Sequence, residues 1–372
     1  YLSPLGHTEP LSANVQVSPL GSSHTINVGS GLLGRVLNGF GAPLDKLGPI
    51  VAVATVAVDQ APPGPLDRQP ITAHFETGFR VIDTLLSCGV GQRIGVFAPA
   101  GVGKSTLIGE LARRSQSDVN VIALVGERGR EVGDFIRNNL SAETRARTVV
   151  VAATSDRSAM ERVRAAQVAT AIAEYFRDEG ANVLLLVDSI TRLARAQREI
   201  GLALGEPPTR RGFPPSVFSM LPRLLERSGV GEKGSITAFY TVLTEGDEHD
   251  DPIAEEVRSI LDGHLILSRE RAASEVFPAV DVLASNSRLM TTLLDTHQNE
   301  AARECRKLLA RYEEVRLLVQ IGEYEEGSDA LTDRAIALHD VIEAHCHQPL
   351  GVPAVSAGDA FTQLRSILAQ TP

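Results

Sequence analysis

The chain has 372 residues, of which 43% are apolar and 22% are charged, a composition typical of a folded protein with about two or three domains. Its 46 acidic residues exceed its 36 Lys and Arg residues, and the net charge of −10 disfavours a nucleic-acid-binding role, which needs a basic surface. No run of about 18 apolar residues predicts a membrane-spanning helix, and three cysteines without metal-ligand spacing (Cys88, Cys305 and Cys346) indicate free thiols in a reducing cytosol.

Short strands separated by turns are predicted at the start of the chain. Residues 14–17 and 25–28 alternate apolar and polar side chains between Pro and Gly, a pattern typical of β-strands. Because the chain begins with Tyr1 rather than Met, within strand-like sequence, we expect that it lacks its natural start. A turn-rich connection is predicted for residues 33–70, where Pro and Gly are frequent.

From about residue 90 onwards, strands alternate with helices. Apolar runs typical of buried strands occupy residues 93–98, 119–125, 148–153, 183–187, 236–243 and 264–267. The clearest helix is predicted for residues 158–179, where Ser158 and Glu161 form a capping box and Gly180 supplies the stop. This alternation predicts an α/β fold in which a largely parallel sheet is covered by helices on both faces.

The last part of the chain has helical patterns only. Residues 299–321, 330–345 and 358–369 show helical periodicity, and glycines and a proline separate them. No strand pattern follows residue 293. A separate α-helical C-terminal domain is therefore predicted.

A phosphate-binding loop is predicted at residues 98–105, with the sequence APAGVGKS between a predicted strand and a predicted helix. Gly101 and Gly103 allow backbone N–H groups to turn toward phosphates, and the start of the helix adds partial positive charge. Lys104 is expected on the β- and γ-phosphates and Ser105 on Mg²⁺. The first position is alanine rather than the usual glycine. The alternative, a glycine-rich turn that happens to precede a lysine, is disfavoured by the flanking strand and helix.

A second motif is the apolar strand of residues 183–187, which ends in Asp188. A buried strand that ends in a carboxylate is the Walker-B arrangement, in which Asp188 holds Mg²⁺, through water. Any buried strand can end in an aspartate, so the motif is weak alone. Its pairing with the phosphate-binding loop favours the functional interpretation.

Charged residues follow the strand of residues 119–125 directly. Carboxylates at the carboxyl end of a parallel strand lie at the ligand crevice, so Glu127 is a candidate general base that orients the attacking water. The alternative is a solvated charge cluster that opens a helix, with Glu131 near the helix start.

Arg288 is a candidate arginine finger, which would reach the γ-phosphate on a neighbouring subunit. A single arginine is more often a surface cation, and this alternative stays open.

Together these segments resemble the rotary ATPases, of which the ATP synthase catalytic subunit is the best-known member. Within that family the chain looks most like the ATPases of bacterial type III secretion systems, and the similarity covers nearly its whole length. The most telling segments are residues 32–39, 87–93, 126–135, 188–192, 194–211, 234–246 and 251–263.

The resemblance implies roles for individual residues. The catalytic positions are matched by Glu127, Lys104, Arg288 and Arg128. The nucleotide-binding positions are matched by Ala98, Pro99, Ala100, Gly101, Val102, Gly103, Lys104, Ser105, Thr106, Asp188, Arg192, Glu131 and Phe277. Ser105 and Asp188 match the Mg²⁺ positions, and Phe277 falls where the family stacks an aromatic ring on adenine, although a plain core phenylalanine is the alternative.

The sequence departs from the family pattern at three places. Ala98 replaces the first glycine of the loop, as is common in secretion ATPases. Asn286 stands where an apolar residue is usual, and Glu275-Val276 replaces the usual Gly-His.

The resemblance also implies domains and partners. A RecA-like P-loop core is expected in residues 31–293, after the remnant of an N-terminal β-barrel in residues 1–30 and before the C-terminal helical domain in residues 294–372. A homohexameric ring is implied, with ATP at subunit interfaces and with residues 201–215 at the pore or the central stalk. Implied partners are the stalk, stator-type regulators and chaperone–effector complexes, the last at the C-terminal helices. The resemblance also implies that the protein lies in the cytoplasm and is held near the inner membrane by the export apparatus. No nucleic-acid partner is expected.

Three other functions remain open at this point. The flagellar export ATPase is the near alternative to the virulence injectisome, which residues 250–259 and 281–285 favour. A hexameric nucleic-acid motor is disfavoured by the negative charge and by an aromatic content of only 4%. A non-catalytic ring subunit is disfavoured because Lys104, Glu127 and Asp188 are all retained.

Overall fold

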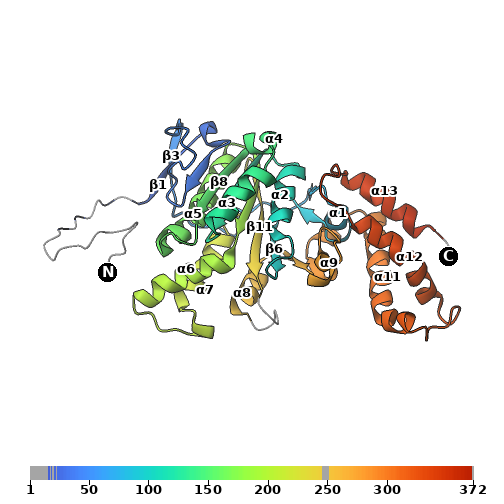
Figure 1. The fold of residues 1–372 in the computed structure, drawn as a ribbon. Coiled ribbons are helices and arrows are strands. Elements are labelled where there is room, and N and C mark those ends of the chain that lie inside the picture. The colour runs from blue at the N-terminus through green and yellow to red at the C-terminus, as the bar shows by residue number, and fades with distance from the viewer. Residues whose placement is uncertain (1–15, 17, 19–20, 22, 245–250, 371–372) are drawn as a thin grey trace. The chain divides into compact units, whose positions relative to one another are not determined.

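The computed structural model describes residues 16, 18, 21, 23–244 and 251–370. The chain divides into two compact units that interleave along the sequence (Figure 1). The first, here called the sheet unit, comprises residues up to 70, 91–95 and 117–261. The second, here called the P-loop unit, comprises residues 71–90, 96–116 and 262–372. Each unit is described separately.

The sheet unit is built on five parallel strands in the order β11-β9-β7-β8-β2. Their bounds are Ser235–Leu243, Asn182–Asp188, Val119–Val125, Thr148–Ala153 and Val36–Asn38, respectively. Every residue of β7 and β8 is buried, which is the pattern of strands covered on both faces. The short strand β10 (Gly229–Val230) pairs antiparallel with β11. The prediction of a largely parallel sheet in an α/β fold is confirmed.

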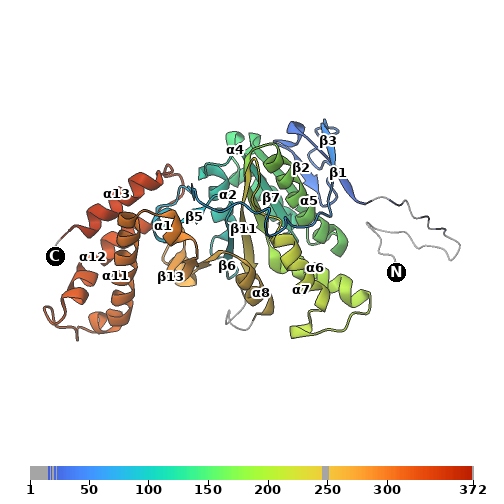
Figure 2. The same ribbon diagram turned by 180° about the vertical axis from the view of Figure 1, so that it is seen from behind.

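Helices of the sheet unit connect these strands (Figures 1 and 2). Their bounds are α3 Gly129–Asp134, α4 Ala142–Ala146, α5 Ala159–Asp178, α6 Ile190–Ala203, α7 Pro215–Leu225 and α8 Pro252–Ile260. A π-helical turn, Phe135–Asn139, continues α3, and a 3₁₀ turn, Arg210–Gly212, precedes α7. The predicted ends of α5 are confirmed: the Ser158 hydroxyl accepts the Glu161 N–H, and Gly180 follows with a φ of 98°. Only this half of the predicted capping box forms, since the Glu161 carboxylate makes no return bond to the Ser158 N–H.

Two strands lie in the segment that was predicted to be only turn-rich. Strand β2 joins the edge of the parallel sheet, and β3 (Ala54–Ala57) pairs antiparallel with β1 (Thr25–Val28). Strands of three or four residues among Gly and Pro carry too little alternation to be recognised, and their pairing partners decide their conformation. Strand β1 was predicted. The predicted strand at residues 14–17 lies outside the described residues except for Gln16.

A buried ion pair fastens α5 to the segment after α7 in the sheet unit. The Arg227 guanidinium donates to both carboxylate oxygens of Glu174, at 2.8 and 2.5 Å, and to the Val58 carbonyl at 3.0 Å. The two side chains are only 3% and 4% exposed. Removal of one partner would leave a desolvated charge without its counter-ion.

We expect that Glu174→Leu lowers the free energy of unfolding by about 3–5 kcal/mol, because the Arg227 charge stays buried without its carboxylate. The double variant Glu174→Leu/Arg227→Met should recover most of this loss, since it removes both charges. Urea denaturation followed by circular dichroism measures both effects. As a control, Asp59→Asn breaks the more exposed Asp59–Arg164 pair and should cost less than about 1 kcal/mol. An equal loss in the two single variants would contradict the expectation.

The P-loop unit combines short strands with most of the later helices (Figure 2). Its first elements are β4 His74–Phe75, α1 Arg80–Leu85, β5 Cys88–Gly89, the end of β6 (Arg93–Ala98) and α2 Lys104–Arg114. Then come β12 Gly263–Leu267, α9 Arg269–Ala273, β13 Val280–Ser287, α10 Met290–Leu293, α11 Thr296–Gln320, α12 Ala330–Cys346 and α13 Ala357–Leu368.

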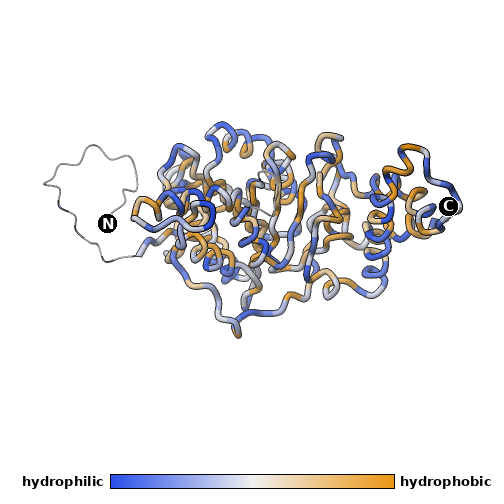
Figure 3. Tube along the Cα trace, turned by 90° about the horizontal axis from the view of Figure 1, so that it is seen from below, coloured by the Kyte–Doolittle hydropathy of each residue, from blue (hydrophilic) through white to orange (hydrophobic). Residues whose placement is uncertain are grey.

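The predicted C-terminal helices are confirmed as α11, α12 and α13, which pack on one another and on α1. Along these helices the tube of Figure 3 alternates between hydrophobic and hydrophilic segments, as expected of helices with one face in a core. Strand β13, antiparallel to β12, was not predicted. No helix in the described part of the chain has the length and apolar character needed to cross a membrane.

Candidate active site

The phosphate-binding loop of the P-loop unit has the predicted strand–loop–helix arrangement. Strand β6 ends at Ala98, and α2 begins at Lys104, whose side chain is largely buried. Gly103 is the N-cap of α2, and no side chain caps the helix there. The start of a helix carries N–H groups and partial positive charge, which suits the binding of an anion.

The two glycines of the loop are required by backbone conformation. Gly101 and Gly103 have φ values of +84° and +88°, in the left-handed region that favours glycine. A Cβ atom at Gly103 would also lie 3.1 Å from Cε1 of Phe277. Ala98, by contrast, is the fully buried last residue of β6 and has no positive φ. Its position therefore does not need a glycine, which explains why this departure from the family pattern is tolerated.

A second departure falls on a strained position. Glu275 has a φ of +58° at the end of α9, and its N–H donates to the carbonyl of Ala272 at 3.1 Å. Glycine suits this left-handed position at a helix end. Asn286, the third departure, points from an exposed position of β13, where no apolar residue is required for packing.

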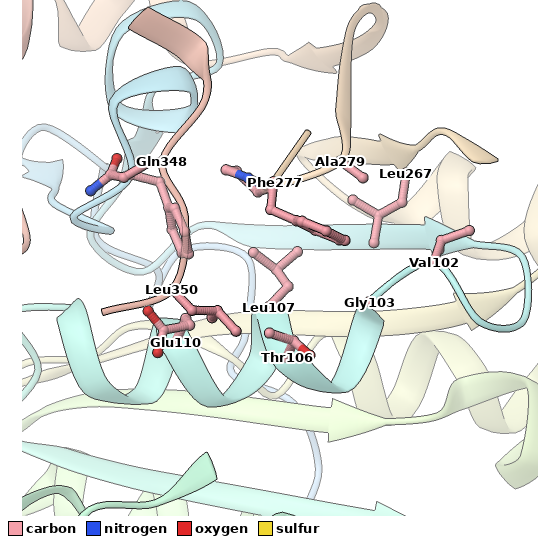
Figure 4. A pocket seen from close by; sticks show the side chains of 12 residues that line it. Val102, Gly103, Thr106, Leu107, Glu110, Leu267, Phe277, Ala279, Gln348 and Leu350 are labelled. Carbon is pink, nitrogen blue, oxygen red and sulfur yellow. The ribbon is translucent and has the colours of Figure 1, made fainter. Parts of the chain in front are cut away.

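A small apolar pocket lies beside α2 in the P-loop unit (Figure 4). The ring of Phe277 faces it with the side chains of Leu107, Leu267 and Leu350. The remaining lining residues are Phe79, Val102, Gly103, Thr106, Glu110, Pro278, Ala279 and Gln348. Val102, Gly103 and Thr106 belong to the loop and the first turn of α2, so the pocket is continuous with the phosphate-binding segment. Apolar and aromatic side chains of this kind are the groups against which a flat aromatic base packs.

Gln348 and Leu350 follow α12, and sequence reasoning did not find them. They lie about 70 positions after Phe277, in a segment without a recognisable motif. No signal in the sequence joins these residues to the loop, because only the fold brings them to the same pocket.

In the sheet unit, Glu127 follows the carboxyl end of β7 and is largely buried. Its Oε2 lies 2.5 Å from Nη1 of Arg192, which also donates to the Gly126 carbonyl at 2.7 Å. Arg192 comes from the first turn of α6, after β9. Two neighbouring strand ends thus hold one carboxylate and one guanidinium against each other.

Glu131 and Arg128 complete this cluster. A hydrogen bond with Glu127 lowers the pKa of Glu131, and the charges of Arg128 and Arg192 lower it further. The Arg128 side chain is 81% exposed and lies 3.4 Å from the Glu131 carboxylate. The structure therefore brings together four residues that the sequence had singled out, with Glu127 buried and Arg128 at the solvent side.

Asp188 is the last residue of β9 and is 1% exposed. The Thr241 hydroxyl, from the neighbouring strand β11, lies 2.8 Å from Oδ1 of Asp188 and can donate to it. Sequence reasoning did not find Thr241, which stands inside an ordinary apolar strand. Asp188, Glu127 and Arg192 share one end of the parallel sheet, since Asp188 pairs with Leu124 of β7.

Arg288 follows β13 in the P-loop unit and is exposed. Its N–H donates to the Asp262 carbonyl at 3.0 Å. Phe277 precedes β13 and Arg288 follows it, so eight strand residues separate them. The first and last residues of β13 pair with Leu267 and Gly263 of β12, which are four positions apart, so the two ends of β13 lie roughly 14 Å apart.

Comparisons with known proteins agree on the family. The family model of the ATP synthase alpha/beta nucleotide-binding domain matches residues 78–287, and that of the T3SS EscN ATPase C-terminal domain matches residues 294–366. A Type 3 secretion system ATPase of Xanthomonas euvesicatoria is 59% identical over 348 residues, 94% of this chain and 79% of the relative. A flagellum-specific ATP synthase of Treponema pallidum is 54% identical over 323 residues, 87% and 72% of the two chains.

A solved structure is similar over nearly the whole chain. The assembled ATPase EscN of enteropathogenic E. coli, in complex with its central stalk EscO, has a TM-score of 0.92 and 47% identity. The match covers 98% of this chain and 88% of EscN.

Proposed function

Because this chain belongs to the ATP synthase alpha/beta family, we propose that it hydrolyses ATP to ADP and phosphate to energise protein export through a type III secretion system. One observation carries the proposal: the nucleotide-binding model and the secretion-ATPase C-terminal model match consecutive parts of the same chain. The ATPase activity follows from the family itself. The secretion role rests on the C-terminal match and on relatives of that name. We propose that the energy of hydrolysis unfolds the exported proteins and releases their chaperones.

We assign the binding of ATP to the P-loop unit. Lys104 and the N–H groups at the start of α2 hold the phosphates, and Phe277 stacks on the base. The helix start after the glycine-rich loop and the adjoining apolar pocket support this assignment.

We assign the hydrolytic water to Glu127. A carboxylate that accepts a proton from water must be held in place, and the Arg192 guanidinium at 2.5 Å holds Glu127. Arg128, exposed beside it, supplies positive charge near the phosphates.

The chemistry of Ser105 and Asp188 fits Mg²⁺. Both offer oxygen ligands, which this ion prefers, and Asp188 is oriented by Thr241. Among the described residues no group of three or more His, Cys, Asp or Glu side chains gathers as a metal site. That agrees with an ion held mainly by phosphate and water. Bound Mg²⁺ neutralises charge on the β- and γ-phosphates.

A ring of identical subunits, taken here as a homohexamer, explains the place of Arg288. Phe277 and Arg288 lie at opposite ends of β13, and Arg288 is not among the residues that line the pocket of Phe277. In a ring it reaches the site of the neighbouring subunit.

Arg288→Ala should therefore spare nucleotide binding but stop multiple turnovers, with a loss of about 10³-fold or more in the steady-state rate. Rapid-quench measurement of phosphate release, with calorimetry for ATP affinity, checks both parts. Arg269→Ala removes another arginine of the same unit, from α9, and should leave the rate unchanged. Turnover at the wild-type rate in Arg288→Ala would contradict the assignment of Arg288 as an arginine finger.

The partners follow from the same family. We propose that the ring binds a central stalk, as EscN does with EscO, together with stator-type regulators, and that α11–α13 receive chaperone–effector complexes. The proposed place is the cytoplasmic face of the inner membrane, at the export apparatus. No contact with nucleic acid is part of this proposal.

The flagellar export ATPase is the competing function, since flagellar relatives are nearly as similar. Deletion of the gene, followed by assays of effector secretion and of swimming, separates the two. We expect secretion to be lost and swimming to be kept, with rescue by the wild-type gene and not by the Lys104→Ala form. Normal secretion in the deletion strain would refute the proposal.

A further inference from the structure

The residue proposed to stack on the base is held by the C-terminal helical part of the chain. Phe277 lies on the connection between α9 and β13. Its N–H donates to Nδ1 of His347 at 3.1 Å, and its carbonyl accepts the N–H of Gln348 at 2.7 Å. Both polar groups of the Phe277 backbone are thus engaged by two consecutive residues that follow α12. The segment of residues 347–350 is called the strap below.

The strap is itself fixed to the first part of the P-loop unit. Gln348 is only 2% exposed, and its Oε1 accepts the N–H of Arg80 at 3.0 Å. Its Nε2 donates to the Gly78 carbonyl at 3.0 Å and to that of Pro353 at 3.3 Å. The Arg80 guanidinium donates in turn to the His347 carbonyl at 2.7 Å. A buried amide with three partners fixes the strap in one position.

The strap also reaches the pocket and α2. Gln348 and Leu350 line the same pocket as Phe277 (Figure 4). The Arg114 guanidinium, at the end of α2, donates to the Pro349 carbonyl at 3.3 Å. One continuous set of contacts therefore runs from α12 through the strap to the stacking ring.

We propose that His347 and Gln348 are positioning residues that set the place of the Phe277 ring, so that the strap tunes the affinity for the base of the nucleotide. The inference rests on the proposed role of Phe277. His347 acts through its Nδ1 atom, which accepts in the neutral form that carries its proton on Nε2. Gln348 acts through its backbone N–H. Neither side chain takes part in phosphate chemistry.

The arrangement couples α12 to the pocket that Phe277 lines. A protein bound to α12 that shifts the strap would displace Phe277 and change the affinity for ATP. Because coupling between two sites is reciprocal, ATP would change the affinity for that protein by the same factor. The helices that follow β13 would thus sense the base of the nucleotide.

The test uses His347→Ala, which removes the acceptor of the Phe277 N–H, and His347→Asn, whose Oδ1 can replace Nδ1. We expect His347→Ala to raise Kd and KM for ATP about two- to tenfold, with kcat kept within about twofold. His347→Asn should restore most of the affinity. The affinity for inorganic tripolyphosphate, which has no base, should not change. His339→Ala, on α12 but away from the strap, is the matched control.

A double-mutant cycle shows whether His347 acts through the ring. Phe277→Ala should weaken ATP binding about five- to 150-fold, and adding His347→Ala to it should change nothing further. Additive losses, an unchanged ATP affinity in His347→Ala, or an equal loss of tripolyphosphate affinity would each overturn the proposal. If His347→Ala does not fold by circular dichroism, His347→Leu fills a similar volume without an acceptor and is used instead. Calorimetric affinities need no turnover, so a wild-type chain without ATPase activity would refute the proposed function separately.

Discussion

Glu127→Gln is expected to lower the rate of ATP hydrolysis by about 10²–10⁴-fold, while the affinity for ATP stays within a few-fold of wild type. Glutamine keeps an oxygen that can accept from Arg192, so the local packing is preserved, but it cannot take a proton from water. The buried position of Glu127 at the end of β7 makes this loss specific to catalysis. Single-turnover hydrolysis and calorimetric binding of ATP measure the two quantities.

The matched control for this prediction is Glu143→Gln, which makes the same change at an exposed position in α4. It should hydrolyse ATP at the wild-type rate. The Glu127→Ala form should also lose hydrolysis, and it removes the partner of the Arg192 guanidinium as well. Undiminished turnover in Glu127→Gln or Glu127→Ala would overturn the assignment of the general base.

Lys104→Ala is expected to abolish measurable hydrolysis, with a loss of about 10³-fold or more, and to weaken ATP binding as well. The lysine ammonium is the charged group of the loop that we propose to meet the phosphates, and Lys104, in the first turn of α2, is 9% exposed. The binding loss distinguishes this variant from Glu127→Gln, which should bind ATP normally.

Lys307→Ala serves as the control for the lysine replacement. Lys307 is exposed on α11 in the same unit, and its removal changes the net charge by the same amount. It should bind and hydrolyse ATP like the wild type. A Lys104→Ala protein that retained wild-type turnover would remove the basis for placing the phosphates on this loop.

Much of the fold is contained in local sequence patterns. The strand of residues 93–98, the loop and the helix that begins at Lys104 follow one another directly, so neighbouring residues suffice to predict them. The long helix α5 was predicted between its cap at Ser158 and its stop at Gly180, and both were confirmed. Family, fold and ATPase activity were likewise confirmed by the comparisons.

Other features depend on contacts between distant residues. Strand β13 alternates irregularly between buried and exposed positions, so its pattern did not identify a strand, and its pairing with β12 defines it. The hydrogen bond from Thr241 to Asp188 joins residues 53 positions apart. The strap reaches Phe277 across 70 positions. No periodicity in the sequence predicts these long-range contacts, because the packing of the whole unit determines them.

Strand β13 carries Phe277 just before its first residue and Arg288 just after its last. In a ring, the first would belong to the subunit's own site and the second to the site next door. Because β13 joins the two residues directly, a shift that follows base binding at Phe277 would change the position of Arg288 at the γ-phosphate of the neighbouring site. Such a link would make neighbouring sites hydrolyse ATP one after another. The hydrolysis rate should then depend cooperatively on ATP concentration.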